Sequence, residues 1–206
     1  MVKICSSILL LIIVGMSCNK NRPIVTGPPT PDSTFTDTRD GQEYTFRHIG
    51  SQVWMTQNLN YAAAESWCYD NNIDYGNLYG RFYDWNTALN AAPPGWHLPT
   101  DAEWTTLTDF LGGESKAGGA MKATVSWESP NTGATNNSGF NGLAGGALTN
   151  AGSFYYMGKI SVWWTSTENF LGPNIVFIRN LAWDKANVER SWHYKDNKYS
   201  IRCVRN

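Results

Sequence analysis

The chain has 206 residues, with 16 Lys and Arg against 17 Asp and Glu, so its formal net charge is −1. This balance argues against a basic nucleic-acid-binding surface. The aromatic content of 14%, with ten Trp and ten Tyr, excludes a largely disordered chain. The charged fraction of 16% is below the roughly 25% of average soluble domains, so solubility rests on uncharged polar residues. This composition is typical of an extracytoplasmic protein, and the length suits one domain.

The first 17 residues are predicted to be a signal peptide. Lys3 supplies a positive charge, and an apolar run follows at residues 8–14. This run is too short to span the roughly 30 Å of bilayer hydrocarbon. Small residues then lead to Cys18, in a pattern that resembles a bacterial lipoprotein signal. The resemblance implies cleavage before Cys18 and lipidation of that cysteine, and several acyl chains would anchor the protein stably. The alternative is an ordinary secretory peptide.

Residues 18–35 are predicted to be a semi-extended tether, because prolines interrupt this segment at positions 23, 28, 29 and 31. No other stretch shows a comparable change in composition. We therefore expect a single folded domain over residues 36–206.

The first elements of that domain are expected to be a hairpin and two helices. Alternating apolar residues at 44–49 and 52–55, joined by a Gly50-Ser51 turn, predict a β-hairpin. Residues 82–89 predict a short helix with Phe82, Trp85 and Leu89 on one face. A second helix is predicted to begin after Thr100 as N-cap and to end before Gly112, with Glu103 completing a capping box.

The second half of the domain is predicted to contain a long ordered loop followed by strands. Residues 130–152 are rich in Gly and Asn, which predicts the loop. Strand patterns return at residues 162–165, 174–181 and 199–204. A hairpin, two short helices, long Gly/Asn-rich loops and late strands together predict an α+β domain with a small antiparallel sheet.

Eight segments resemble the Fibrobacter succinogenes major paralogous domain family of bacterial surface and secreted proteins. They are DGQEY at 40–44, IGSQVWM at 49–55, NLNY at 58–61, YGNLY at 75–79, PGWHLPTDAEW at 94–104, NSGF at 137–140, WWTST at 163–167 and IRCV at 201–204. Residues 98–104 are also similar to a run in formylglycine-generating enzymes. The wider similarity implies a C-type-lectin-like fold, in which the terminal strands pair and long loops cover one side.

Beyond Cys18, the mature chain holds Cys68 and Cys203. These two residues form an even pair for an oxidising compartment, and a disulfide between them would close a long loop. Alternatively, each is a buried free thiol whose usual family partner is missing. Both interpretations stay open, because the sequence does not supply the Cα separation that a disulfide requires.

The sequence predicts no enzyme, metal site or cofactor. His48, His97 and His193 lie in separate segments, and no zinc-binding spacing or nucleophile motif occurs. Asp101 and Glu103 belong to a predicted helix start, where a capping role suits both. Formylglycine-generating enzymes use two nearby cysteines close to the C-terminus, and this chain has only Cys203 there.

The tryptophans are the best candidates for ligand contacts. Five of them fall inside the family motifs and are expected in the core: Trp54, Trp96, Trp104, Trp163 and Trp164. Trp127, Trp183 and Trp192 lie outside those motifs, near asparagines that include Asn187. Flat aromatic faces beside amide groups are typical of sugar-binding surfaces. We therefore select Trp127, Trp183, Trp192 and Asn187 as candidate ligand-binding residues.

These observations predict a lipid-anchored protein of the bacterial cell envelope, in the outer membrane. The sequence leaves both orientations open, with the domain on the periplasmic face or on the cell surface. Its expected role is non-catalytic binding of a polysaccharide or a surface protein, with the membrane as a second partner through the lipid. One alternative is a structural envelope component without a discrete ligand. The third hypothesis is a degenerate oxidoreductase of the formylglycine-generating type.

Overall fold

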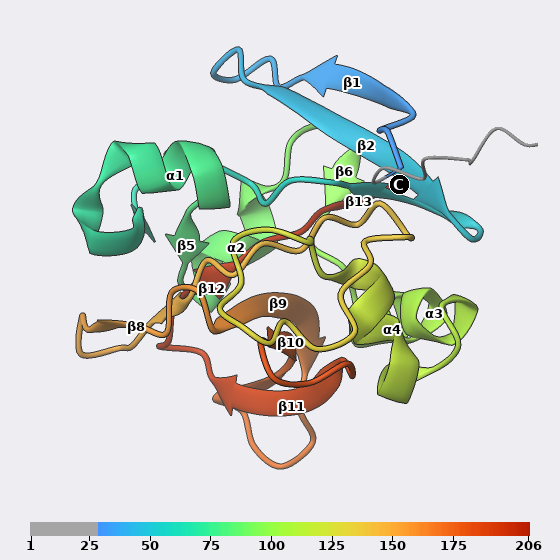
Figure 1. Cartoon of the computed structure of the whole chain (residues 1–206). Helices are drawn as coiled ribbons and strands as arrows, with labels where there is room; N and C mark the ends of the chain where they lie inside the picture. The colour runs from blue at the N-terminus through green and yellow to red at the C-terminus, as the bar shows by residue number, and fades with distance from the viewer. Residues whose placement is uncertain (1–28) are drawn as a thin grey trace, which may run out of the picture.

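The fold is described from a computed structural model, in which residues 29–206 are placed. Two sheets form its framework (Figure 1). The five-stranded sheet has the order β1-β2-β3-β13-β6, and the six-stranded sheet has the order β11-β10-β9-β12-β5-β4. The predicted signal peptide, Cys18 and most of the predicted tether lie outside the described residues.

The bounds of the strands in the five-stranded sheet are β1 Ser33–Thr36, β2 Glu43–Ile49, β3 Gln52–Met55, β6 Trp96–His97 and β13 Val204–Arg205. Those in the six-stranded sheet are β4 Ser66–Trp67, β5 Phe82–Tyr83, β9 Ile160–Glu168, β10 Ile175–Ala182, β11 Glu189–Tyr194 and β12 Tyr199–Ser200. A separate pair joins β7 Ala147–Leu148 to β8 Phe154–Tyr155. The helices are α1 Ile73–Tyr79, α2 Trp85–Ala91, α3 Asp101–Phe110 and α4 Glu114–Met121, with a 3-10 turn at Tyr69–Asn71.

The structure confirms the α+β class and several of the predicted elements. β2 and β3 form the expected hairpin, with Ile49 opposite Gln52 across the turn. Thr100 caps α3, and its hydroxyl accepts from the Glu103 N–H at 3.1 Å. The Glu103 carboxylate accepts from the Thr100 N–H at 2.8 Å, which completes the predicted capping box. His97 holds the same carboxylate, with Nε2 2.8 Å from Oε1.

Other predicted elements need correction. The described residues contain four helices instead of two, and their strands form three sheets instead of one. The helix predicted at 82–89 is a short strand, β5, followed by α2, which Asp84 caps by accepting from the Thr87 N–H at 2.7 Å. Because Asp84 caps α2, the helix begins at Trp85 and does not include Phe82. Phe82 is instead buried in the sheet, while Leu89 on the helix is 39% exposed.

The folded domain begins before the predicted boundary at residue 36. β1 pairs with β2 over Ser33–Thr36, and the Phe35 ring stacks on Trp96 with centroids 4.6 Å apart. Asp32 adds a hydrogen bond from the His48 N–H at 2.7 Å. The last residues of the predicted tether are therefore part of the sheet.

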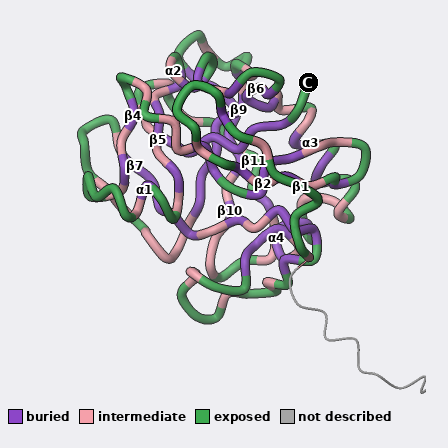
Figure 2. Tube along the Cα trace, turned by 90° about the horizontal axis from the view of Figure 1, so that it is seen from above, coloured by how far each residue is buried: buried purple, intermediate pink, exposed green. Residues whose placement is uncertain are grey.

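Two clusters of buried side chains make up the core. One fills the space between the two sheets and contains Tyr44, Met55, Trp164 and Ile178. The other packs α3 and α4 against the sheets through Trp104, Met121 and Trp163. All five tryptophans expected in the core are at most 7% exposed. Figure 2 shows the buried chain gathered in the middle, around β9 and β10, with exposed segments at the periphery. None of the described helices combines the length and apolar character needed to cross a bilayer.

Candidate ligand-binding surface

Strand β11 carries the most exposed aromatic pair in a regular strand of the described residues. It lies at the edge of the six-stranded sheet, where Trp192 pairs with Phe177 and Tyr194 with Ile175 on β10. Because side chains alternate along a strand, Trp192 and Tyr194 point to the same face. They are 42% and 58% exposed, and their rings lie 6.3 Å apart at an interplanar angle of 88°.

An apolar groove of about 360 Å³ lies beside this pair. The loop between β9 and β10 forms its other wall, and this loop exposes Phe170 to 88% and Leu171 to 59%. The lining residues are Leu171, Gly172, Pro173, Asn174, Ile175, Trp192 and Tyr194. Large apolar side chains gathered at this exposure are unusual on a monomer unless they bind something.

A polar groove of about 700 Å³ continues from the apolar groove and shares Asn174 and Tyr194 with it. Its lining residues are Glu65, Trp67, Asp84, Asn86, Asn174, Tyr194, Lys195, Asp196 and Lys198. Lys195 Nζ donates to Glu168 at 2.6 Å and lies 4.3 Å from the centre of the Trp85 ring. These two contacts hold the Lys195 side chain in place. Lys198 lies 5.3 Å from the centre of the Trp67 ring. Together the two grooves offer aromatic faces, amides and carboxylates along one surface.

Of the four residues selected from the sequence, Trp192 lies on this surface. Trp127 is half-buried, and its Nε1 donates to the Gly142 carbonyl at 2.9 Å. Trp183 is also half-buried, and its backbone is held by Lys159 and Thr132 at 2.8 and 2.9 Å. Asn187 packs its backbone against α4. Trp183 and Asn187 belong to the turn between β10 and β11, whereas Trp192 lies toward the other end of β11. The four therefore do not form one face.

Sequence reasoning missed Tyr194, Trp67, Phe170 and Leu171. The alternation of Trp192, His193 and Tyr194 is a strand signal that places both aromatics on one side, so Tyr194 was accessible to that argument. The other three depend on tertiary structure. Trp67 reaches the polar groove because β4 pairs with β5. Leu171 lines the apolar groove because the β9–β10 loop borders it, and Phe170 is exposed on the same loop.

Cys68 and Cys203 are free thiols in the structure, and both are buried, so the predicted alternative of a disulfide between them is not what the structure shows. Arg81 Nη1 donates to Cys68 Sγ at 3.1 Å. Burial raises the pKa of the Cys203 thiol to about 12, so it is protonated at neutral pH. A protonated buried thiol is a poor nucleophile. The burial of Cys203 therefore lends no support to a redox role.

The histidines are engaged in pairwise contacts. His193 Nδ1 contacts the Tyr199 hydroxyl, and burial lowers the pKa of its ring. His48 Nδ1 lies 2.8 Å from Asp32 Oδ2. Within residues 29–206, no three His, Cys, Asp or Glu side chains gather in a geometry suited to a metal ion.

Residues 48–205 match the sequence model of the family described as the Fibrobacter succinogenes major domain. No curated protein and no solved structure matches the chain.

Proposed function

Because the chain belongs to the Fibrobacter succinogenes major domain family, we propose that it is a lipid-anchored envelope protein whose domain binds an extracellular polysaccharide without catalysis. The observation that carries this proposal is the exposed pair of Trp192 and Tyr194 beside two continuous grooves. Aromatic faces pack on the apolar faces of sugar rings, while amides and carboxylates accept their hydroxyl protons.

The proposal includes a C-type-lectin-like fold and a lipid on Cys18. The fold is supported by β1 and β13, which bring both ends of the domain into one sheet, and by the long segment between α4 and β7. Lipidation is supported by the resemblance of the segment around Cys18 to a lipoprotein signal. Incorporation of labelled palmitate, lost in Cys18→Ser, would test it, and an unlabelled wild-type protein would contradict it.

Polysaccharide binding is tested by retention of the full mature chain, carrying Cys18→Ser to keep it soluble, on insoluble and soluble polymers. We expect Trp192→Ala and Tyr194→Ala each to weaken retention about tenfold, equivalent to about 1.4 kcal/mol. Tyr156→Ala is the matched control, because Tyr156 is 59% exposed and lies outside both grooves. Retention that survives both β11 variants would remove this surface from the proposal, and sensitivity to EDTA would indicate a metal.

A protein partner is the second candidate, favoured by Phe170 and Leu171. These side chains are too apolar and too exposed to be explained by sugar hydroxyls alone. A double variant, Phe170→Ser with Leu171→Ser, separates the two candidates. Chemical crosslinking to envelope proteins and retention on polysaccharide are measured for this variant. Lost crosslinks with unchanged retention would favour a protein partner, and unchanged crosslinks with lost retention would favour the polysaccharide.

A further inference from the structure

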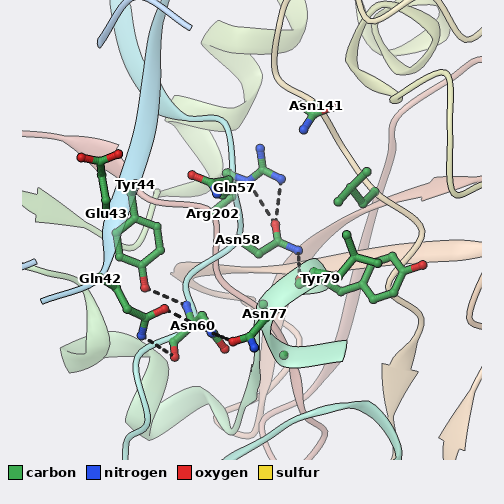
Figure 3. Close-up of a pocket in the computed structure, with 14 residues that line it drawn as sticks. Gln42, Glu43, Tyr44, Gln57, Asn58, Asn60, Asn77, Tyr79, Asn141 and Arg202 are labelled. Atoms are coloured by element: carbon green, nitrogen blue, oxygen red, sulfur yellow. Dashed lines mark hydrogen bonds between the residues drawn. The ribbon is translucent and has the colours of Figure 1, made fainter. Parts of the chain in front are cut away.

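A second cavity, of about 160 Å³, lies in a different part of the molecule from the β11 grooves. It opens between β2 and the C-terminal half of α1, whereas β11 lies at the opposite edge in Figure 1. Six side-chain amides surround it: Gln42, Gln57, Asn58, Asn60, Asn77 and Asn141 (Figure 3). Tyr44, Tyr79 and Arg202 also line it, and the exposed carboxylate of Glu43 lies at its rim. The proposed polysaccharide surface uses none of these residues.

Arg202 is 1% exposed and has only uncharged hydrogen-bond acceptors. Nε and Nη2 donate to Asn58 Oδ1 at 3.0 and 2.8 Å. Nη1 donates to the carbonyls of Met55, at 3.2 Å, and Phe140. A guanidinium carries five N–H groups, so one N–H of Nη2 is left without an acceptor among the described residues.

The other fully buried arginine shows what Arg202 lacks. Arg179 is 0% exposed, and its Nη1 forms an ion pair with Asp101. Arg202 has no carboxylate among its partners in residues 29–206, and the ring centres of Phe140 and Trp163 lie 4.2 and 5.8 Å from its guanidinium. A buried cation without a counter-charge is unfavourable, and its burial lowers the Arg202 pKa to about 9. An anion placed in the cavity would supply the missing charge.

The remaining donors and acceptors restrict the chemistry of that anion. Carboxylates suit guanidinium and amide N–H groups as acceptors. The side-chain amides of the lining can accept from hydroxyls through their oxygens. The volume of about 160 Å³ is below the roughly 300–1,000 Å³ of drug-sized ligand pockets, so the cavity has room for the carboxylate end of an acid and leaves the rest of a sugar ring outside.

We propose that this cavity binds the carboxylate of a small hydroxylated acid, with Arg202 as its cationic partner and the surrounding amides holding its hydroxyls. Two kinds of ligand would supply the same carboxylate: a uronic acid at the end of a polysaccharide, and a free hydroxy acid. The site is independent of the β11 surface, so Trp192→Ala is expected to leave it intact.

Titration calorimetry on the full mature chain with Cys18→Ser tests the proposal, using glucuronate, glycolate and neutral glucose as ligands. We expect binding of at least one acid and none of glucose. Glucuronate alone would indicate a sugar acid, and glycolate alone would indicate a free hydroxy acid. Absence of binding by both acids, or equal binding of glucose, would overturn the proposal whatever the outcome for polysaccharides.

Gln57→Glu is the decisive variant, because it changes charge at the mouth of the cavity and preserves the fold. Gln57 is exposed, and its Oε1 accepts from the Thr45 N–H at 2.8 Å, a contact that a glutamate retains. We expect the added charge to weaken acid binding about tenfold or more. Asn90→Asp adds the same charge on α2, away from the cavity, and is expected to bind normally. Unchanged affinity in Gln57→Glu would overturn the assignment.

A second measurement reports on Arg202 itself without altering it. In 15N-labelled protein, the Nε–H resonance of Arg202 is expected to shift on addition of the bound acid. The Nε–H of Arg179 serves as the internal reference, because that arginine already has its carboxylate. A shift at Arg179 with none at Arg202 would place the acid elsewhere and contradict the proposal.

Discussion

The side-chain oxygen of Asn58 accepts two hydrogen bonds from Arg202, at 3.0 and 2.8 Å, although 144 residues separate the two along the chain. The same oxygen accepts from Trp163 Nε1 at 2.8 Å. Asn58 Nδ2 donates to the Tyr79 carbonyl at 2.8 Å. One amide therefore ties the loop after β3, helix α1, strand β9 and the last segment of the chain together.

Asn58→Ala is expected to destabilise the domain by about 3–5 kcal/mol, because it leaves a buried cation and a buried indole N–H without their acceptor. Urea unfolding at neutral pH under reducing conditions measures the change. Asn90→Ala, at an exposed site on α2, is the control and is expected to change stability by less than about 0.5 kcal/mol. A loss below about 1 kcal/mol in Asn58→Ala would show that water replaces the amide.

Thr100→Ala is expected to lower the free energy of unfolding by about 1 kcal/mol through loss of the α3 cap. The hydroxyl bonds both the backbone N–H and the carboxylate of Glu103. Thr106→Ala, on an exposed turn of the same helix, is the control, since its hydroxyl only bonds the Ala102 carbonyl. Equal effects of the two substitutions in urea unfolding would argue against the capping box as a source of stability.

The sequence was most informative where structure is local. The capping box and the β2–β3 hairpin follow from residues within a few positions of each other, and both are confirmed. Helix α4 was missed because ESKAGGAM contains two glycines, which have low helix propensity. Its Gly118 and Gly119 are required by close packing against residues 133 and 186–187, which a helical pattern does not reveal.

The candidate surfaces were less predictable, because exposure depends on tertiary contacts. Trp127, Trp183 and Trp192 all lie outside the family motifs and near asparagines, yet of the three only Trp192 is on an edge strand with its ring exposed. Trp127 is held by Gly142 and partly covered by Lys122, 5.4 Å from its ring. The amide-lined cavity was not predicted, since its residues come from five segments that only the fold brings together.

Gly118→Ala is expected to destabilise the protein by about 3 kcal/mol, although alanine favours helices over glycine by about 1 kcal/mol. A Cβ at this position would lie 2.2 Å from the Asn187 carbonyl oxygen, and backbone does not yield as a flexible side chain does. Ser115→Ala, at an exposed position of α4, is the control and is expected to be neutral or slightly stabilising. Thermal unfolding of the two variants compares them, and equal melting temperatures would contradict the contact.

Stability is expected to fall as the pH rises from about 9 to 12, in part through Cys203. Burial holds the pKa of this thiol at about 12 in the folded state, above its ordinary value of 9.0. The folded state therefore binds the proton more tightly, and the resulting stability is present below pH 9 and lost as the pH approaches 12. Cys203→Ala is expected to show a shallower decline in urea unfolding between pH 8 and 11. Identical slopes in the two proteins would contradict this role.

Asp101 is expected to contribute to the loss of folding stability at acidic pH, because its carboxylate pairs with two arginines. Arg190 donates to both of its carboxylate oxygens, with Nη2 2.9 Å from Oδ2, and the buried Arg179 donates to Oδ1. Burial acts to raise the pKa of Asp101, but the hydrogen bond from Arg190 and the charge of Arg179 outweigh it and lower the pKa below its usual value. A lowered carboxyl pKa stabilises the folded state above the unfolded pKa of about 3.9, and this contribution disappears as the pH falls through the folded value.

Asp101→Asn is therefore expected to lose about 3 kcal/mol at pH 7, mainly because the buried Arg179 loses its hydrogen-bonded carboxylate and is left with the more distant one of Glu114, 4.0 Å away. The difference from the wild-type protein is expected to shrink as the pH is lowered below about 3.9, because the wild-type carboxylate is then progressively protonated. Urea unfolding across this range measures both effects. Asp109→Asn removes an equal charge from an exposed position of α3 and is expected to change stability by less than about 0.5 kcal/mol. A constant difference between Asp101→Asn and wild type at every pH would assign the loss to packing instead of charge.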